Sequence, residues 1–390
     1  MRNFDFAMPT QILFGRDTEA QVGRQVRDRG GHTVLLHYGG GSVQRSGLYD
    51  RVTASLEAAG LQVVPLGGVQ PNPRLTLVRE GIDLCRRRGV DFLLAVGGGS
   101  VIDSAKAIAV GAPDKGNVWD FYIGLRQPTA RLPLGVVLTI PAAGSEASNS
   151  SVITNEQGWL KRGLGSEVIR PDFAILNPVL TYTLPAYQTA CGAADIMAHV
   201  MERYFTNEPH VDLTDRLCEA VLTSMIHNVP LALAHPEDYD ARAEIMWAAT
   251  LAHNDLLSCG RVGDWASHQI EHELSALYDV AHGAGLAVVF PAWMRYVYRH
   301  NVALFAKFAS RVFGVPYDFD NPERTALAGI DALRSFFAAI GLPVTLSELG
   351  VGDDRLREMA QKVKKGPDGY TGQFVKLTSQ DVYQIYCSVK

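Results

Sequence analysis

The sequence has few cysteines, and no two of them form a C-x-x-C pair. The five are scattered and odd in number: Cys85, Cys191, Cys218, Cys259 and Cys387. A disulfide framework and a zinc site made of thiolates both need cysteines in paired, closely spaced patterns. The absence of such patterns argues against both and predicts a protein of the reducing cytoplasm.

The chain also lacks a strong excess of one charge. It has 36 basic and 41 acidic residues, and its short basic runs, 86–88 and 362–365, are not interleaved with aromatic residues that could stack on bases. Such a surface creates no field that would recruit nucleic acid or an anionic membrane. We therefore expect neither as a partner.

Long hydrophobic runs are missing as well. The amino-terminal segment MRNFDFAMPTQILFG has no apolar stretch of the kind that a secretory signal needs. The longest apolar runs, 132–144 and 283–294, fall short of the ~20 residues of a membrane-spanning helix. The sequence thus predicts a soluble protein that is not exported.

The length and texture of the chain predict two domains. At 390 residues it is longer than one compact core usually holds. Before Pro185, short β-rich runs alternate with helical segments, which is typical of a parallel sheet covered by helices. The expected strands are 11–14, 33–38, 62–66, 92–96, 134–140 and 173–176. We predict an α/β domain over residues 1–184.

After Pro185 the β-rich runs end, and apolar residues recur with a helical period over stretches such as 213–229, 240–257 and 324–340. Prolines are expected to break these helices, because proline removes a backbone donor and clashes with the preceding turn. They occur at Pro209, Pro230, Pro236, Pro291, Pro316 and Pro343. Residues 185–390 are therefore predicted to form an all-helical domain.

Two glycine clusters follow expected strands of the first domain. Gly97, Gly98 and Gly99 come directly after the apolar run FLLAV, and Ser100 begins a helical segment. Glycines let a phosphate approach the backbone, and the amides of a helix start supply donors. Ser100 is expected to cap that helix together with Asp103. A tight turn with a good cap is the alternative reading, and the second cluster favours the phosphate loop.

That second cluster is Gly39, Gly40 and Gly41 with Ser42, after the expected strand TVLLHY. In many NAD-binding folds an acidic residue at this place accepts the ribose 2′-hydroxyl and repels the 2′-phosphate of NADP. No carboxylate stands here, and Arg45 is near. The pattern favours NADP(H) over NAD(H), although neither cluster has the G-x-G-x-x-G spacing.

Histidines and one aspartate in the second domain have metal-ligand spacing. Asp195 and His199 are four residues apart in a helical pattern, as are His268 and His272, and His282 follows a predicted break. Residues four apart lie on one helix face. A lone pair of this kind is usually a surface or capping interaction, but two pairs with a further histidine favour a site for Fe(II) or Zn(II).

These motifs resemble those of the iron-containing (group III) alcohol dehydrogenases, specifically the NADP-dependent butanol dehydrogenase and broad-range aldehyde reductase branch. The resemblance covers essentially the whole chain through TQILFG, VQPNP, AVGGGSVIDSAKAIA, LTIPAAGSE, the helix of Asp195, MWAATLAHN and DWASHQIEHELSALYDVAHGAGLA. It implies an α/β dinucleotide-binding domain and an all-helical metal-binding and substrate domain, as in dehydroquinate synthase, and a homodimer.

The resemblance also implies roles for individual residues. The metal ligands would be Asp195, His199, His268 and His282, with Fe(II) favoured over Zn(II), while His272 matches a histidine beside the nicotinamide and substrate. The implied cofactor positions are Gly97, Gly98, Gly99, Ser100 and Asp103 at the pyrophosphate, Asn72 at a ribose, Gly39, Gly40 and Ser42 at the 2′-phosphate, and Thr139 and Lys161 at further cofactor-side positions.

The implied reaction is reversible hydride transfer between NADPH and a small aldehyde, with the metal as Lewis acid and His272 relaying a proton. A buried histidine that only orients a neighbour is the other reading of His272. Residues 142–151, AAGSEASNSS, depart from the family pattern near the substrate, so no substrate contact is predicted. A polyol or sugar-phosphate enzyme would lack the equivalent of His199, and a metallohydrolase would leave the glycine clusters without a role.

Overall fold

The computed structural model describes all 390 residues. They form two compact units, Ala7–Thr183 and Leu184–Lys390, and the second unit also contains Met1–Phe6. The backbone N–H of Arg2 donates to the carbonyl of Gly260 at 3.0 Å. Met1–Phe6 were predicted to belong to the first domain, because nothing in their local pattern indicates this distant partner.

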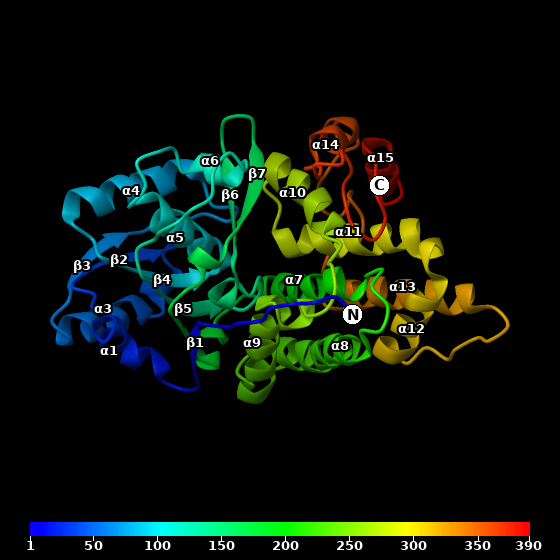
Figure 1. The fold of residues 1–390 in the computed structure, drawn as a ribbon. Coiled ribbons are helices and arrows are strands. Elements are labelled where there is room, and N and C mark those ends of the chain that lie inside the picture. Colours follow the sequence, from blue (N-terminus) through cyan, green and yellow to red (C-terminus); the bar gives the residue numbers. More distant parts are fainter. The chain divides into compact units, whose positions relative to one another are not determined.

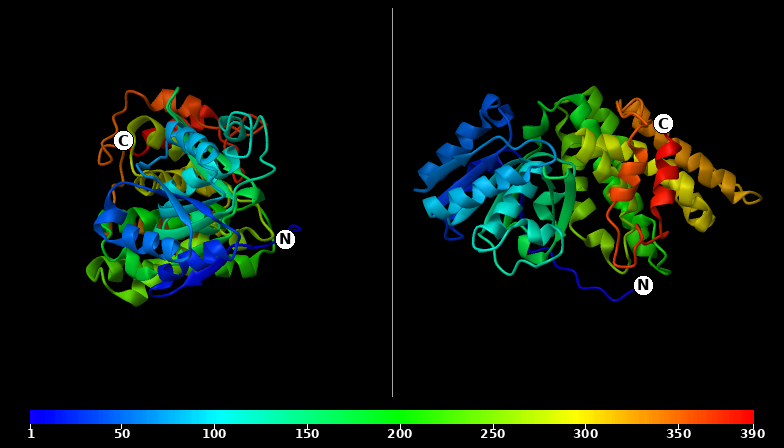
Figure 2. Two further views of the ribbon diagram at one scale, coloured as in Figure 1. Left: turned by 90° about the vertical axis from the view of Figure 1, so that its left-hand side faces the viewer. Right: turned by 90° about the horizontal axis from the view of Figure 1, so that it is seen from above.

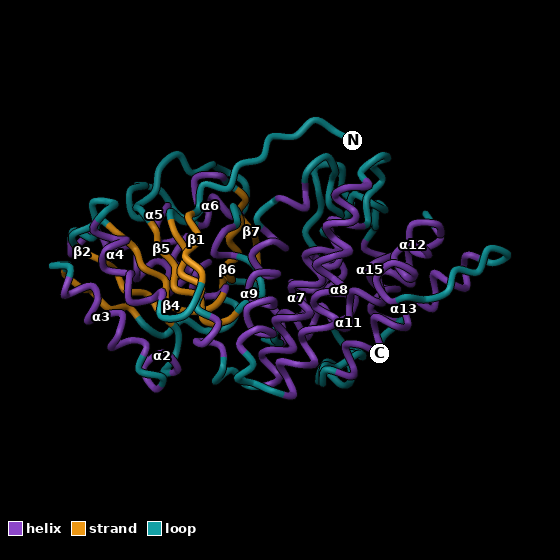
Figure 3. The backbone as a smooth tube through the Cα atoms, turned by 90° about the horizontal axis from the view of Figure 1, so that it is seen from below, coloured by secondary structure: helices purple, strands orange, loops and turns teal.

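The first unit is built on a six-stranded parallel sheet, drawn in orange in Figure 3. All six runs that were expected to be strands belong to it. In spatial order they are β1 (Gln11–Phe14), β8 (Phe173–Leu176), β5 (Leu134–Ile140), β4 (Phe92–Gly98), β2 (Thr33–Tyr38) and β3 (Gln62–Leu66). β4 and β8 are buried along their whole length, as expected for apolar strands that are covered on both faces.

Helices cover both faces of this sheet, with α1 and α3 on one side and α4 and α5 on the other (Figure 1). The helices of the unit are α1 (Val22–Arg27), α2 (Ser42–Arg45), α3 (Leu48–Ala58), α4 (Leu75–Arg88), α5 (Gly99–Gly111) and α6 (Trp119–Tyr122). An antiparallel hairpin of β6 (Ser150–Asn155) and β7 (Leu160–Gly165) was not predicted. Its strands, SSVITN and LKRGLG, mix apolar residues with serine, glycine and charged residues, so they lack the continuous apolar run of the sheet strands.

The second unit is helical, and the two views of Figure 2 show its helices in colours from green to red. They are α7 (Ala186–Tyr204), α8 (Asp212–Ala234), α9 (Tyr239–His253), α10 (Ala266–Tyr278), α11 (His282–Val297), α12 (Val302–Phe313), α13 (Pro322–Ala339), α14 (Leu356–Lys362) and α15 (Ser379–Cys387). A single large apolar core joins α7 to α15. The predicted fold class, an α/β unit and a helical unit, is confirmed.

Two of the predicted helix breaks are wrong. Pro230 lies inside α8 and Pro291 lies inside α11. A proline within a helix costs about 3 kcal/mol, and burial of neighbours such as Phe290 and Trp293 in the core offsets this cost. The other four prolines lie outside the helices.

By length and composition alone, α8 could cross a membrane, since one window of it has a mean hydropathy of 1.4. One face of the helix, including Cys218, Leu222, Met225 and Val229, belongs to the apolar core of the second unit. Core helices of water-exposed proteins have the same composition. We interpret α8 as such a core helix.

Candidate active site

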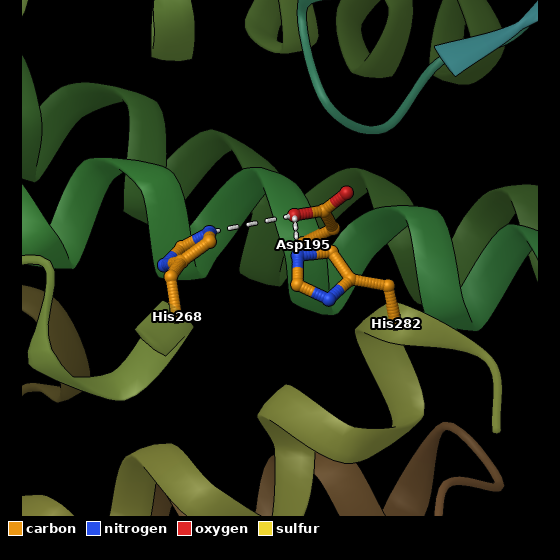
Figure 4. Close-up of side chains that lie close together, drawn as sticks. All are labelled: Asp195, His268 and His282. Atoms are coloured by element: carbon orange, nitrogen blue, oxygen red, sulfur yellow. Dashed lines mark ion pairs between the residues drawn. The ribbon is translucent and has the colours of Figure 1, made fainter. Parts of the chain in front are cut away.

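Three helices of the second unit bring an aspartate and two histidines together. Asp195 lies on α7, His268 on α10, and His282 is the first residue of α11; Figure 4 shows their side chains pointing toward one another. Their potential ligand atoms lie within 4.8 Å of each other. Asp195 Oδ1 is 3.8 Å from His268 Nε2 and 3.9 Å from His282 Nε2.

The distances between these atoms suit coordination of a shared metal ion better than direct hydrogen bonds between the side chains. His268 Nε2 is buried and makes no hydrogen bond, and its distance of 3.8 Å to Asp195 Oδ1 is too long for one. Two atoms on one ion with bonds of about 2.1 Å can be at most about 4.2 Å apart. Because unsatisfied buried polar atoms are costly, the donor set fits a divalent ion that accepts oxygen and imidazole ligands.

His199, the fourth predicted ligand, lies beside this group but is not part of it in this conformation. Its Nδ1 is 2.9 Å from the carbonyl oxygen of Asp195 and 2.9 Å from Oδ1 of the same residue. Its ring centroid is 4.4 Å from that of His268. With Nδ1 engaged, Nε2 is the nitrogen left for a ligand role, which stays a prediction.

Glu202 is a further buried residue of the site, and no role was predicted for it from the sequence. It lies on α7, and its Oε1 is 2.9 Å from His268 Nδ1 and accepts from the backbone N–H of His268 at 3.0 Å. Its Oε2 accepts from the N–H of Trp265 at 2.6 Å. The carboxylate thus holds the first turn of α10 and directs His268 Nε2 toward Asp195. Its spacing, three residues after His199 on one helix face, could have identified it.

The charges of the site favour a cation. Burial tends to raise the pKa of Asp195, but His199 and His282 hold this pKa well below its usual value. Burial tends to lower the pKa of His268, but interaction with the Asp195 and Glu202 carboxylates raises it to about 9. A buried pair of carboxylates therefore keeps positive charge at this place.

His272 lies one helical turn after His268 on α10 and is buried. Its ring centroid is 5.5 Å from that of His282. Its potential ligand atom falls within 4.8 Å of those of Glu271 and His282 rather than with Asp195. This position beside the predicted ligands is compatible with the expected proton relay, which remains a prediction.

The glycine clusters of the first unit lie at the carboxyl ends of two neighbouring strands. β2 continues to β3 on one side and β4 to β5 on the other, so the strand order reverses between β2 and β4. Ligands of open α/β sheets bind at such a point. Tyr38 pairs with Val96, so Gly39 and Gly97, each one residue further, lie side by side. The pairing of β4 with β5 adds Thr139 to this edge.

The glycines of the two clusters are required for different reasons. A Cβ at Gly97 would lie 2.5 Å from Val101, and one at Gly98 would lie 2.9 Å from Ile140. Packing of the protein itself therefore excludes side chains there. A Cβ at Gly40 would meet nothing within 4 Å, and one at Gly39 only ordinary contacts. Protein packing therefore leaves space beside Gly39 and Gly40, as expected if a ligand occupies that space.

The predicted cap of α5 is wrong. The helix begins at Gly99, its N-cap is Gly98, and no side chain caps it. Ser100 is its second residue, and the partly buried Asp103 instead accepts from Ser145 Oγ at 2.6 Å and from the backbone N–H of Val152 at 2.9 Å. Because Asp103 is engaged by Ser145 and Val152, it does not cap the helix, and the first amides of α5 have no side-chain acceptor.

The remaining predicted cofactor residues also lie in the first unit. Ser42 begins α2 directly after the second cluster. Asn72 follows β3, is buried and has a φ of 55°, a conformation that asparagine tolerates. Lys161 is buried on β7, and its charge acts to lower the pKa of Asp103, which burial raises. Their predicted contacts with a cofactor are not tested by this arrangement.

Fold and site together are typical of an oxidoreductase that uses a nucleotide and a metal. The glycine clusters at the ends of β2 and β4 form a nucleotide-type sheet edge in one unit, and Asp195, His268 and His282 form a metal-type cluster in the other. Residues 9–178 match the family model "Iron-containing alcohol dehydrogenase", and residues 189–389 match "Fe-containing alcohol dehydrogenase family, C-terminal". The chain belongs to the iron-containing alcohol dehydrogenase family. It is an oxidoreductase of this type, which confirms the resemblance, and the metallohydrolase alternative is not supported.

Individual relatives match over nearly their full length. The "Probable NADH-dependent butanol dehydrogenase 1" of Bacillus subtilis is 43% identical over 385 residues, 99% of each chain. The "NADPH-dependent aldehyde reductase YqhD" of Escherichia coli is 38% identical over 389 residues, again 99% of each. The crystal structure of NADH-dependent butanol dehydrogenase A from Thermotoga maritima superposes with a TM-score of 0.96 at 40% identity, covering 100% of this chain and 99% of that one.

Proposed function

We propose that this protein is a metal-dependent, NADP(H)-linked reductase of small aldehydes that also oxidises the corresponding alcohols. The observation that carries the metal dependence is the buried His268 Nε2, which makes no hydrogen bond and faces Asp195 Oδ1 at 3.8 Å. Butanol dehydrogenase and aldehyde reductase are names of relatives, and they support four-carbon and similar aldehydes as substrates.

In this proposal each residue group has a defined task. The ion, Fe(II) or alternatively Zn(II), would be held by Asp195, His199, His268 and His282, and it supplies Lewis acidity toward a carbonyl group. Asp195 stays ionised because its pKa is held low. The free amides at the start of α5 would bind the pyrophosphate of the nucleotide.

His272 is proposed to give a proton to the product hydroxyl and to take it back in the reverse reaction. Its burial near His282 supports this role, because an imidazole can both donate and accept near neutral pH. His272→Ala should then lower turnover by ~10²- to 10⁴-fold with unchanged metal content. Loss of the metal from this variant would instead make His272 a ligand.

The proposed preference for NADPH rests on the second glycine cluster. Residues 39–42 offer a sheet edge without a carboxylate, and the guanidinium of Arg45 lies over Gly41, where a Cβ would be 2.8 Å from Nη1. The relatives divide on this point, since their names include both NADH-dependent and NADPH-dependent enzymes. Butyraldehyde reduction with each nucleotide decides it: a lower KM for NADPH that Ser42→Ala removes supports the preference, and a lower KM for NADH contradicts it.

We also propose a cytoplasmic homodimer. β1 is an edge strand of the sheet, and the side chain of Phe14 at its end is more than a third exposed. Exposed edges and apolar side chains of this kind are usually covered in solution. Light scattering during gel filtration tests this, and a monomer at micromolar concentration would contradict it.

A further inference from the structure

Glu271 is a second buried carboxylate beside the predicted ligands, and it contacts side chains of two helices. It lies on α10 and is fully buried. Its Oε2 pairs with His282 Nδ1, and its Oε1 accepts a hydrogen bond from Ser275 Oγ. With Nδ1 of His282 engaged by Glu271, Nε2 of the same ring is the nitrogen that faces Asp195, at 3.9 Å.

Two glycines of α11 make this arrangement sterically feasible. A Cβ at Gly285 would lie 2.6 Å from Glu271 Oε1, so only glycine leaves space for the carboxylate. A Cβ at Gly283 would lie 1.9 Å from the carbonyl oxygen of Cys191 on α7, so glycine there lets α11 approach the helix that carries Asp195. Both glycines therefore serve the position of His282.

Glu202 and Glu271 act on different histidines in different ways. Glu202 engages His268 and also accepts two backbone N–H groups of the first turn of α10, so its removal would disturb the helix as well. The Glu271 contacts with Ser275 and His282 are between side chains. Replacement of Glu271 is therefore the cleaner way to test an outer carboxylate.

We propose that Glu271 is a positioning residue: it fixes the tautomer and ring orientation of His282, and Ser275 and Gly285 hold Glu271 in place. Carboxylates that accept from the second nitrogen of a ligating histidine commonly raise metal affinity in this way. The inference rests on the proposed metal site. In the competing arrangement Glu271 is itself a ligand, together with His272 and His282, because their ligand atoms also lie within 4.8 Å of one another.

The test is a titration of the metal-free full-length protein with Co(II) against a competing chelator, followed by visible absorption. Glu271→Gln should bind Co(II) ~10- to 100-fold more weakly than wild type and keep one ion per chain with bands of the same coordination. Gly285→Ala keeps the carboxylate but displaces it and should give a similar loss, while Ser275→Ala should give a smaller one. These two variants also carry the test if Glu271→Gln does not fold.

Glu219→Gln is the matched control, because it removes a buried carboxylate of the same unit whose partners are Tyr204 and Arg311. Its Co(II) affinity should equal that of wild type. Wild-type protein that binds no Co(II) contradicts the proposed function itself. If wild type binds Co(II) and both Glu271→Gln and Gly285→Ala bind it with the same affinity, only the present inference is overturned. The same holds if Glu271→Gln changes the coordination bands of Co(II), or if it loses a second Co(II) ion that wild type binds.

Discussion

The metal-type cluster and the nucleotide-type sheet edge are built by opposite means. In the second unit, side chains converge until the buried His268 Nε2 faces Asp195 Oδ1 at 3.8 Å, too far for a hydrogen bond between them. In the first unit, side chains are left out, and Gly39, Gly40 and Gly97 end or follow two adjacent strands. A cluster of the first kind should fail when a group is removed, and an edge of the second kind should fail when a group is added.

The largest effect is expected from removing the carboxylate at the cluster. Asp195→Asn keeps the shape of the side chain but removes the charge that the neighbouring imidazoles share. Aldehyde reduction should fall by about 10³-fold or more, on the order of 4 kcal/mol in the activation free energy. Metal analysis of the purified variant should show loss of the ion. Near wild-type turnover with bound metal would remove Asp195 from the site.

The buried imidazole of His37 in the first unit contrasts with that of His268, because both ring nitrogens of His37 are hydrogen-bonded. Its Nδ1 is 2.9 Å from the carbonyl oxygen of Leu66 and its Nε2 is 2.9 Å from Ser104 Oγ. Burial lowers the pKa of His37 to about 4. Between the unfolded pKa near 6.5 and this value, the unfolded chain binds the proton and the folded one does not, so acidification destabilises the fold, by on the order of 3 kcal/mol.

Denaturant unfolding at several pH values from 7 to 4 measures this effect. Wild type should lose stability over this range, and His37→Gln, which does not titrate there, should lose less. Equal slopes for the two proteins would show that His37 is not held neutral.

Adding a methyl group where packing already excludes one should destabilise the first unit. In Gly98→Ala the new Cβ would lie 2.9 Å from Cβ of Ile140, which cannot move away freely because β5 pairs with β4 at this residue. Overpacking of this kind costs ~1–3 kcal/mol. Thermal unfolding of the metal-free protein checks it, and an unchanged midpoint would mean that β4 and β5 separate easily.

Adding the same methyl group at Gly40 should affect binding and spare the fold. No atom lies within 4 Å of a Cβ there, so the unfolding free energy of Gly40→Ala should stay within ~0.5 kcal/mol of wild type. If the nucleotide occupies this space, the dissociation constant for NADPH should rise about tenfold, which corresponds to ~1.4 kcal/mol. Fluorescence titration with NADPH measures it, and unchanged affinity would place the nucleotide elsewhere.

The sequence predicted most of the fold and the chemistry of the cluster, but fewer of its supporting contacts. Continuous apolar strands and helical spacing are local signals, so all six sheet strands and the helical positions of Asp195 and His268 followed from them. The role of Asp103 did not, because its acceptors are engaged by Ser145 and Val152, more than forty residues away. Long-range partners of this kind leave no local pattern.

Glu202 and Glu271, the carboxylates behind the predicted ligands, differ in how far the sequence could predict their contacts. Glu202 has the helical spacing of a site residue, but the pairing of Glu271 with His282 depends on the turn between α10 and α11 and on the space at Gly285. Pro230 and Pro291 show the converse, because packing of helix residues such as Val229 and Phe290 in the core outweighed a strong local signal. Local rules failed where tertiary packing supplied the larger free energy.

The most direct test of the proposed metal-dependent reduction is anaerobic reconstitution of the chelator-treated protein, with NADPH oxidation measured on a panel of small aldehydes. We expect the treated protein to be inactive, one Fe(II) per chain to restore turnover, and Zn(II) to occupy the same site. Full activity of metal-free protein, or reconstituted protein that holds the ion but leaves every aldehyde unreduced, would contradict the account.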